Sequence, residues 1–226
     1  MNTAELFSQS RDVADFQHVT LTGQYIHELF ITQGDSESLT IESSPKIMDR
    51  IESTVENGKL SLKLGGGLGD RLRDAITTSL SRPHIVYHLN VRQLRSLEVL
   101  ATAFVNIPRL ETENFSLKYD GAGDISINEL TAGNLEVENS GAGLIKLAGR
   151  VSEQKVSIKG PGEYAAKELL SQRAVIHIKG IGNATVWVVK ELDVTISGMG
   201  GVLYLGSPEV QANISAMGSL TPLGNP

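Results

Sequence analysis

Apolar and polar residues alternate strictly along the second half of the chain. Val156 and Ile158 flank the polar Ser157, and the same order recurs about every 20 residues. After each such run, another alternating segment follows, as in Ile125 and Ile127. A period of two residues is typical of a β-strand with one buried face. The pattern therefore predicts pairs of short strands, repeated along the chain.

Five Gly-x-Gly motifs separate these strands at nearly constant spacing. They are Gly121-Ala-Gly123, Gly141-Ala-Gly143, Gly160-Pro-Gly162, Gly180-Ile-Gly182 and Gly198-Met-Gly200. Ala101-Thr-Ala103 precedes them and Ala216-Met-Gly218 follows them as altered copies, so the steps are 20, 20, 19, 20, 18 and 18 residues. Each unit thus reads as strand, glycine corner, strand and turn, which indicates a repeat architecture.

A unit of this size cannot be stable by itself. Its four or five buried apolar side chains contribute about 1.5–3 kcal/mol each, whereas ordering the backbone costs about 1–2 kcal/mol per residue. Stacking on neighbouring units closes this deficit. We therefore predict an all-β fold, a right-handed parallel β-helix of about 20-residue coils. Glycine suits its corners because successive coils approach closely there or because φ is positive.

A phosphate-binding loop is the alternative interpretation of Gly-x-Gly. That motif needs a helix after the glycines, whereas here a second alternating strand follows each pair. The repetition therefore favours a structural corner.

The first hundred residues also predict strands, but without the repeat. The expected strands are Phe16–Leu21, Tyr25–Thr32, Ser38–Glu42, Ile51–Val55, Leu60–Leu64 and Ile85–Val91. Asn57-Gly58 predicts a hairpin, and residues 46–49 predict one helical turn. Residues 1–15 form a polar lead-in for which a short helix is one option.

One stretch breaks the β pattern. Four glycines within residues 65–69 precede Asp70, a helix N-cap type, and apolar residues then follow at helical spacing up to Pro83. We expect an inserted helix over residues 70–80 that packs over an open end or side of the solenoid. Contact with a partner and attachment to a membrane are the alternatives. The chain then divides into the lead-in 1–15, a β-rich part 16–95 and the repeats 96–220, in one continuous domain.

Composition excludes several classes of protein. The chain has 226 residues, a net charge of -6 and no cysteine, so it has no disulfide framework and no thiolate metal site. No segment is basic enough to indicate nucleic-acid binding, and no apolar run reaches the length of a membrane span. The first residues lack the basic and apolar regions of a signal peptide. Of the 23 glycines, 11 lie in the repeated corners, so the excess of glycine is periodic.

The residues at two places resemble a known family. One place is the entry, Phe16–Gly23 followed by residues 30–35 and 39–42, and the other is the repeat seen best in Asp120-Gly-Ala-Gly-Asp-Ile125. Together they resemble the auto-transporter adhesin, head GIN domain family, a bacterial β-helix family of unassigned biochemical function, over about residues 16–220. The Asp after the second glycine persists only at Asp124. The resemblance implies a location in the cell envelope or outside the cell and brings no catalytic residues.

A catalytic site would need acidic residues on adjacent coils. The column after the glycines contains Asp124 and Glu163, two coils and about 10 Å apart, with Leu144 between them. Inverting glycosidases place their carboxyl groups about 6.5–9.5 Å apart. We therefore predict no catalytic residues and interpret the column as decoration of the corner.

Three residues are weak candidates for ligand binding. Lys159 and Lys179 lie on adjacent coils, where an anionic glycan or a phosphate would relieve their repulsion. Trp187 falls in the outward phase and fits a contact with a sugar or a protein, or partial cover under a loop. His84 and His88 share a strand face but lie about 13 Å apart, so we predict no metal site and no cofactor.

The sequence thus predicts a non-enzymatic binding or scaffold module of the cell envelope, or a secreted one, whose partner is a protein or a glycan. A carbohydrate-active β-helix enzyme and a self-assembling protein similar to the bactofilins are the alternatives. Pro222 and Pro226 oppose strand addition at the C-terminal end, so a homo-oligomer formed by side contacts is expected rather than an open filament.

Overall fold

The computed structural model describes residues 7–65, 84–215 and 217–225. The inserted helix predicted over residues 70–80 lies outside these residues. The 15 described strands form one sheet, in the order β1-β3-β6-β2-β7-β8-β9-β10-β11-β12-β13-β15, with β14, β4 and β5 paired beside this path.

The elements follow one another as strands with one short helix. They are β1 (Phe7–Arg11), β2 (His18–Gln33), β3 (Ser38–Ser43), α1 (Pro45–Met48), β4 (Ile51–Glu56), β5 (Lys59–Leu64), β6 (His84–Val91), β7 (Ser96–Ile107), β8 (Leu110–Tyr119), β9 (Ala122–Asn139), β10 (Ala142–Ile158), β11 (Glu163–Ile178), β12 (Asn183–Ile196), β13 (Gly201–Leu205), β14 (Glu209–Ile214) and β15 (Ser219–Gly224).

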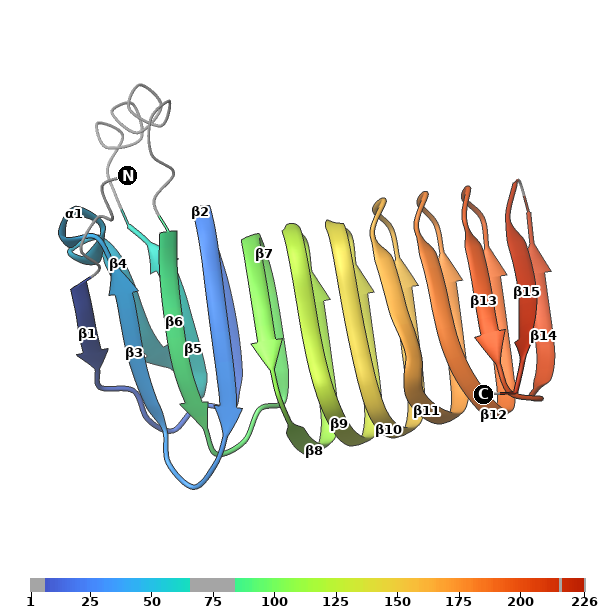
Figure 1. Cartoon of the computed structure of the whole chain (residues 1–226), viewed down its shortest axis with the longest axis horizontal. Coiled ribbons are helices and arrows are strands. Elements are labelled where there is room, and N and C mark those ends of the chain that lie inside the picture. The colour runs from blue at the N-terminus through green and yellow to red at the C-terminus, as the bar shows by residue number, and fades with distance from the viewer. Residues whose placement is uncertain (1–6, 66–83, 216, 226) are drawn as a thin grey trace.

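The repeats form a parallel β-solenoid of about 6 turns, as the spacing predicts. Strands from β7 onward pair in parallel with the next coil along the axis. The pairing keeps repeat positions in register, so that Ser157 lies beside His177 and His177 beside Thr195. Figure 1 shows these coils stacked in a row from β7 to β15. The long strands β9 to β12 bend within each coil and so form two sides of it.

Apolar side chains of equivalent positions stack inside the solenoid. Val137, Val156, Ile176 and Val194 are ladder neighbours from β9 to β12, and each is at most 1% exposed. The residues between them point outward. Each buried aliphatic side chain contributes about 1.5–3 kcal/mol, so a continuous apolar column holds the coils together.

Glycine occupies the corners because the coils nearly touch there. A methyl group on Gly121 would overlap the backbone oxygen of Ala101, and one on Gly141 would overlap that of Gly121. Positive φ contributes little, since Gly123 alone among the ten glycines of the five pairs has a φ in the left-handed range, at 108°. The expected close approach is confirmed, and it is the main reason for the repeated motif.

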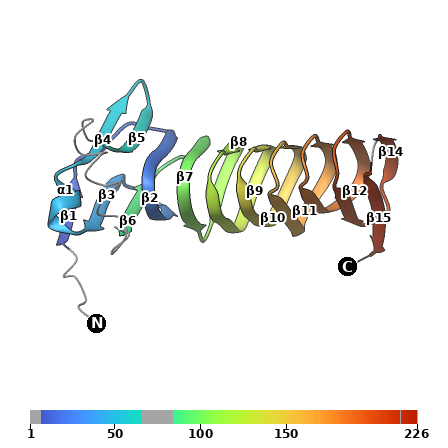
Figure 2. The same cartoon turned by 90° about the horizontal axis from the view of Figure 1, so that it is seen from above.

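The N-terminal part mixes parallel and antiparallel pairs. β1 and β6 both pair with β3 in antiparallel fashion, whereas β2 pairs in parallel with β5, β6 and β7. Figure 2 shows the β4–β5 hairpin at this end of the molecule, opposite β14 and β15. Asn57 and Gly58 turn this hairpin with φ of 52° and 75°, as their sequence predicts.

Two details differ from the sequence prediction. Phe7–Arg11 is a strand, so the option of a helix in the lead-in is wrong there, because pairing with β3 outweighs a weak local preference. The strands expected at 16–21 and 25–32 form the single strand β2. The helical turn expected at 46–49 is confirmed as α1.

Candidate functional site

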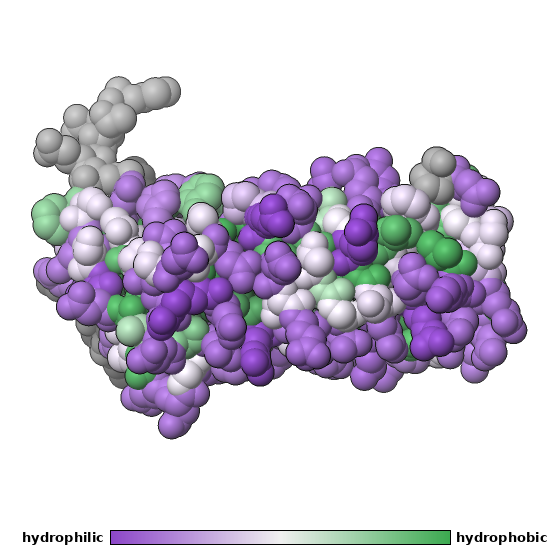
Figure 3. All heavy atoms as spheres, turned by 90° about the horizontal axis from the view of Figure 1, so that it is seen from below, coloured by the Kyte–Doolittle hydropathy of each residue, from purple (hydrophilic) through white to green (hydrophobic). Residues whose placement is uncertain are grey.

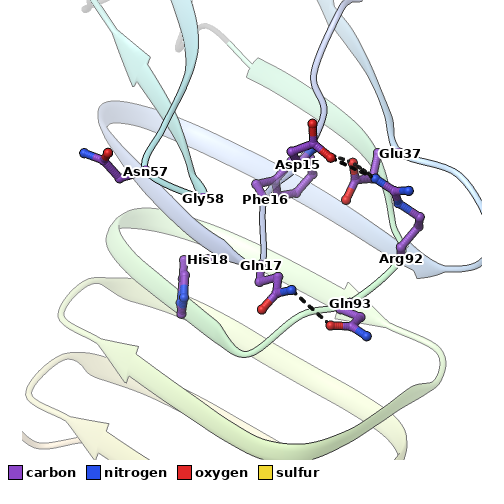
Figure 4. Close-up of a pocket in the computed structure, with 9 residues that line it drawn as sticks. All are labelled: Asp15, Phe16, Gln17, His18, Glu37, Asn57, Gly58, Arg92 and Gln93. Carbon is purple, nitrogen blue, oxygen red and sulfur yellow. Dashed lines mark hydrogen bonds and ion pairs between the residues drawn. The ribbon is translucent and has the colours of Figure 1, made fainter.

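A polar cleft lies in the N-terminal part, before the first repeat coil. It has a volume of about 520 Å³ and is lined by Asp15, Phe16, Gln17, His18, Glu37, Asn57, Gly58, Arg92 and Gln93. Figure 4 shows the acidic and basic groups on one side of the cleft and the β4–β5 turn on the other. The chain therefore brings together four segments that are far apart in sequence.

Arg92 is the centre of the charged side of the cleft. Its Nη2 lies 3.0 Å from Glu37 Oε2 and 3.2 Å from Asp15 Oδ1. The side chain of Glu37 is only 5% exposed, whereas that of Asp15 is 90% exposed. Arg92 thus neutralises a sheltered carboxylate and still presents part of its guanidinium to the cleft.

Glu37 is held in its charged form. Partial desolvation raises the pKa of Glu37, but hydrogen bonds donated by Arg92 and by the backbone N–H of Asp15 outweigh it, so the pKa is lowered overall. The Asp15 N–H donates to Glu37 Oε2 at 2.7 Å. Glu37 is therefore an anionic anchor and cannot act as a general acid near neutral pH.

Amide and imidazole groups line the opposite side. Gln17 donates from Nε2 to Gln93 Oε1 at 3.1 Å, and the Nδ1 atom of His18 lies 2.7 Å from Ser96 Oγ. Each amide retains further donor and acceptor positions after this bond. Amide groups of this kind can form hydrogen bonds with the hydroxyl groups of a ligand, and they do not activate the ligand for reaction.

Two residues with positive φ help to shape the cleft. Asp15 and Asn57, with φ of 59° and 52°, are the only non-glycine residues with positive φ in the described parts of the chain, and both line the cleft. Asp and Asn tolerate this conformation better than other non-glycine residues, and that of Asn57 belongs to the β4–β5 hairpin turn.

The charged groups of the cleft pair with one another. Both carboxylates of the cleft are paired with Arg92. Within the described residues, no group of three or more His, Asp or Glu side chains is placed to hold a metal ion.

The two predicted lysines lie elsewhere, on the solenoid. Lys159 forms an ion pair with Glu138, so a neighbouring carboxylate balances its charge, and its binding of an anionic ligand stays a prediction. Lys179 is exposed and forms no ion pair with any residue that the structure describes. Neither lysine lines the cleft.

Trp187 lies in the outward phase, half-buried between the inward Val186 and Val188. Its ladder neighbours are Leu170 on β11 and Leu205 on β13. Figure 3 shows one long face that is mostly hydrophilic, with hydrophobic residues gathered over its C-terminal half. Neighbouring leucines thus cover part of Trp187, and its role in binding stays a prediction.

His84 and His88 each have an acidic partner. His84 Nε2 lies 2.9 Å from Glu28 Oε1, and His88 Nε2 lies 3.5 Å from Glu42 Oε1. The ring of His88 also stacks on Phe30, with centroids 5.3 Å apart. The two histidines therefore take part in separate contacts on one strand face.

The column after the glycines has the predicted order. Leu144 lies between Asp124 and Glu163. Asp124 Oδ1 accepts a hydrogen bond from the Leu144 N–H at 3.3 Å, and Asn183 Oδ1 accepts one from the Gly201 N–H at 2.8 Å. These side chains tie one coil to the next, which supports their interpretation as decoration of the corner.

Exposed ion pairs connect outward positions of neighbouring coils. Glu136 and Lys155 form one at 3.3 Å. Lys118 is the ladder neighbour of Glu138, but its ammonium pairs at 2.9 Å with Glu98 on the preceding coil. Partner choice between neighbouring coils depends on side-chain reach and cannot be predicted from the ladder alone.

The sequence prediction did not find the cleft. Asn57-Gly58 was identified only as a turn, and Gln17, Arg92 and Gln93 lie outside any repeat. A positive φ at Asp15 has no sequence signal beyond the tolerance of Asp for this conformation.

The fold defines the chain as a parallel β-solenoid protein with a cleft near its N-terminal end. The chain belongs to the family described as "Putative auto-transporter adhesin, head GIN domain", whose model matches residues 15–208. No curated protein matches the chain.

Solved structures share the fold at low sequence identity. A "putative adhesin" from Bacteroides fragilis NCTC 9343 is 20% identical with a TM-score of 0.85, over 98% of both chains. A "putative lipid binding protein" from Parabacteroides distasonis ATCC 8503 is 19% identical with a TM-score of 0.70, also over 98% of both chains. A "putative adhesin" from Parabacteroides merdae ATCC 43184 is 18% identical with a TM-score of 0.68, over 98% of this chain and 97% of the other.

Among the described residues, no helix has the length and hydrophobicity needed to cross a bilayer.

Proposed function

We propose that the chain is a non-enzymatic binding module that acts at the cell envelope or after secretion, and that the polar cleft holds its ligand. Membership of the adhesin family supports the location and the binding role. Strand pairing supports it as well, because β2, which begins at the cleft residue His18, is paired with β5, β6 and β7, and such pairing keeps a wall in place without a ligand.

The internal pairing of charges in the cleft is the observation that carries the proposal. Arg92 is shared between Glu37 and Asp15, and Gln17 is bonded to Gln93. Acid–base catalysis needs a group poised to exchange a proton near the working pH, whereas the pKa of Glu37 is lowered. These groups are instead arranged to accept and donate hydrogen bonds to a ligand that leaves unchanged.

Binding to immobilised mucin, before and after enzymatic removal of its glycans, tests this function. We expect the intact chain to bind reversibly and the double variant Gln17→Ala/Gln93→Ala to bind at least tenfold more weakly. Gln24→Ala, which changes an exposed glutamine outside the cleft, is the matched control and should bind like the unmodified chain.

The fate of the ligand separates binding from catalysis. We expect mass spectrometry of glycans incubated with the protein to show no new reducing ends and no unsaturated products. Release of such products, abolished by Glu37→Gln, would contradict the proposal and favour the enzyme alternative.

A further inference from the structure

Three hollows of the molecule follow one another along the solenoid. The first is the cleft described above. The second, of about 340 Å³, lies over β8, β9 and β10, and the third, of about 380 Å³, lies over β10, β11, β12 and β14. Glu153 on β10 lines both the second and the third, so these two hollows are neighbours that share this side chain.

The first hollow also lies beside the second, because backbone hydrogen bonds connect the segments that line them. Arg95, which lines the second hollow, donates its N–H to the carbonyl of Gln17 in the first, at 2.7 Å. The N–H of Ser116 then donates to the Arg95 carbonyl at 2.9 Å. His18, Ser96 and Ser116 are also successive ladder neighbours. The three hollows therefore lie in one row along the molecule, and we call this row of hollows the axial groove.

Strand register shows the direction of the axial groove. One row of outward positions crosses the strands from end to end: His18, Ser96, Ser116, Glu136, Lys155, Val175, Asp193 and Gln211. Eight strands at a spacing of about 4.8 Å give a length of about 34 Å. The groove thus runs perpendicular to the strands, and its repeat is close to the length of one sugar residue in an extended glycan.

We propose that the axial groove binds a neutral polysaccharide in extended form, with its chain parallel to the solenoid axis. The inference rests on the proposed binding function and adds the class of ligand and its direction. The groove offers hydroxyl, amide and carboxylate groups in rows, as in the Asn134 Nδ2 bond to Asn114 Oδ1 at 2.8 Å. Because a polar or charged side chain occupies this row on every strand except β11, where Val175 stands, several weak contacts add up along one polymer.

Charge decides which polysaccharides fit. The three hollows are lined by four basic side chains, Arg92, Arg95, Lys155 and Arg173, and by seven acidic ones, Asp15, Glu37, Glu136, Glu153, Glu191, Asp193 and Glu209. Three net negative charges would repel an anionic glycan or a nucleic acid. The groove therefore favours a neutral polysaccharide over an anionic one, in contrast to the anionic ligand expected at Lys159 and Lys179.

The lining also favours a glycan over a peptide. Phe115, Leu135 and Leu192 border the groove, but they are at most 2% exposed, so their side chains offer no apolar pocket for a peptide anchor. The strands under the groove are paired on both sides from β8 to β12, so a peptide cannot extend the sheet there. Sugar hydroxyls, in contrast, match the exposed polar groups directly.

Calorimetric titration with neutral oligosaccharides of two to eight units tests the inference. The probes are glucan, mannan, galactan and xylan ladders, with polygalacturonate as the anionic comparison. We expect at least one neutral ladder to bind, with an affinity that rises with length up to about seven units, and polygalacturonate to bind at least tenfold more weakly. Equal affinity for two and eight units, tighter binding of polygalacturonate, or no binding to any neutral ladder would overturn the inference.

Single substitutions distinguish binding along the whole axial groove from binding in the cleft alone. Glu153→Ala should weaken binding of the eight-unit ligand at least fivefold and leave the two-unit ligand unchanged. Glu163→Ala is the matched control, because Glu163 is equally exposed but lies in the outward column after the glycines. Circular dichroism at the same temperatures shows whether each variant is folded.

The results that would contradict binding in the axial groove differ from those that would contradict the proposed binding function. One result would restrict the ligand to the cleft: Glu153→Ala does not change the affinity for an oligosaccharide of any length, whereas Gln17→Ala/Gln93→Ala abolishes binding. The proposal that the ligand extends along the axial groove is then wrong. Preference for unglycosylated peptides over every glycan also overturns the groove but leaves a binding module. If neither glycans nor mucin bind, the proposed function itself is contradicted.

Discussion

The solenoid coils from β9 to β12 and the N-terminal part from β1 to β6 treat buried polar groups differently. In the coils, Gln154, Tyr164 and Ser171 form a closed chain of hydrogen bonds, with Tyr164 donating to Gln154 at 2.9 Å and Gln154 to Ser171 at 2.8 Å. In the N-terminal part, the Nε atom of Arg11, both ring nitrogens of His27 and the hydroxyl of Tyr87 are buried without a hydrogen-bond partner among the described residues, whereas in the described coils the only such atom is Asn139 Nδ2.

This difference reflects how each region is specified. Repeated coils place apolar side chains beside apolar side chains, as in the column of Val137, Val156, Ile176 and Val194, and the Gln154–Tyr164–Ser171 network occurs once among them. The N-terminal part has no such repeat and depends on single contacts, such as the His27–Tyr87 stack with centroids 5.9 Å apart. Unpaired buried groups cost free energy, and the same part forms most of the polar cleft. The less regular region is thus the one that holds the candidate site.

Changing a corner glycine should have the largest effect on stability. In Gly141→Ala, the new methyl group would overlap the backbone oxygen and nitrogen of Gly121, so two coils must separate. We expect a loss of about 4 kcal/mol in the free energy of unfolding, measured by urea denaturation. Gly34→Ala is the control, because a methyl group there meets nothing within 4 Å, and it should change stability by less than about 0.5 kcal/mol. Equal losses at the two sites would contradict the close approach of the coils.

Acid should destabilise the chain through His27. Burial, and then the charge of the nearby His84, lower the pKa of His27 to about 4 from 6.5. Above pH 6.5 the ring is neutral in both states and contributes nothing. Below it, the unfolded chain gains a proton that the folded chain does not, so stability is lost until about pH 4, by about 3 kcal/mol in total.

Comparing His27→Leu with the unmodified chain isolates this effect. We expect the variant to lose less stability than the unmodified chain between pH 7 and pH 4, as measured by urea midpoints. His177→Gln, at a half-buried histidine on the solenoid, serves as the control and should keep the normal pH profile. An unchanged pH profile in His27→Leu would show that other groups cause the acid sensitivity.

The Arg92 cluster should matter more than an exposed pair on the coils. Arg92→Met leaves the sheltered Glu37 carboxylate without its cation, so a clear fall in melting temperature is expected. Arg173→Met breaks the 3.2 Å contact with Glu191, in which both side chains are 57% exposed, and such pairs contribute less than about 1 kcal/mol. A larger fall for Arg173→Met would reverse the comparison of the two regions.

Pro222 should affect association more than stability. The Ser219 N–H donates to Gly200 on the inner side of β15, and alternation along the strand then directs the Pro222 nitrogen toward the open edge. Pro222→Val restores a donor there, so sedimentation velocity should show self-association at lower concentration than in the unmodified chain. We expect the free energy of unfolding to change by less than about 0.5 kcal/mol. Identical sedimentation of both chains would mean that Pro222 does not protect this edge.

The coils could be predicted from the sequence because equivalent positions in successive repeats carry the same type of residue. Val156 alone is ambiguous, but with Val137, Ile176 and Val194 it defines an inward column, and Gly121 with its copies defines the corners. The candidate site has no such redundancy. Arg92 and Asp15 are 77 residues apart, and only the three-dimensional path of β2, β3 and β6 brings their segments together.

Nuclear magnetic resonance mapping of the full chain with a neutral oligosaccharide that binds tests the central claim most directly. We expect the amide shifts to change along the row from Ser116 through Lys155 to Asp193, together with those of the cleft, while the ligand keeps its covalent structure. Changes confined to the opposite column, at Asp124, Leu144 and Glu163, or cleavage of the ligand during the measurement, would contradict a binding module that uses the axial groove.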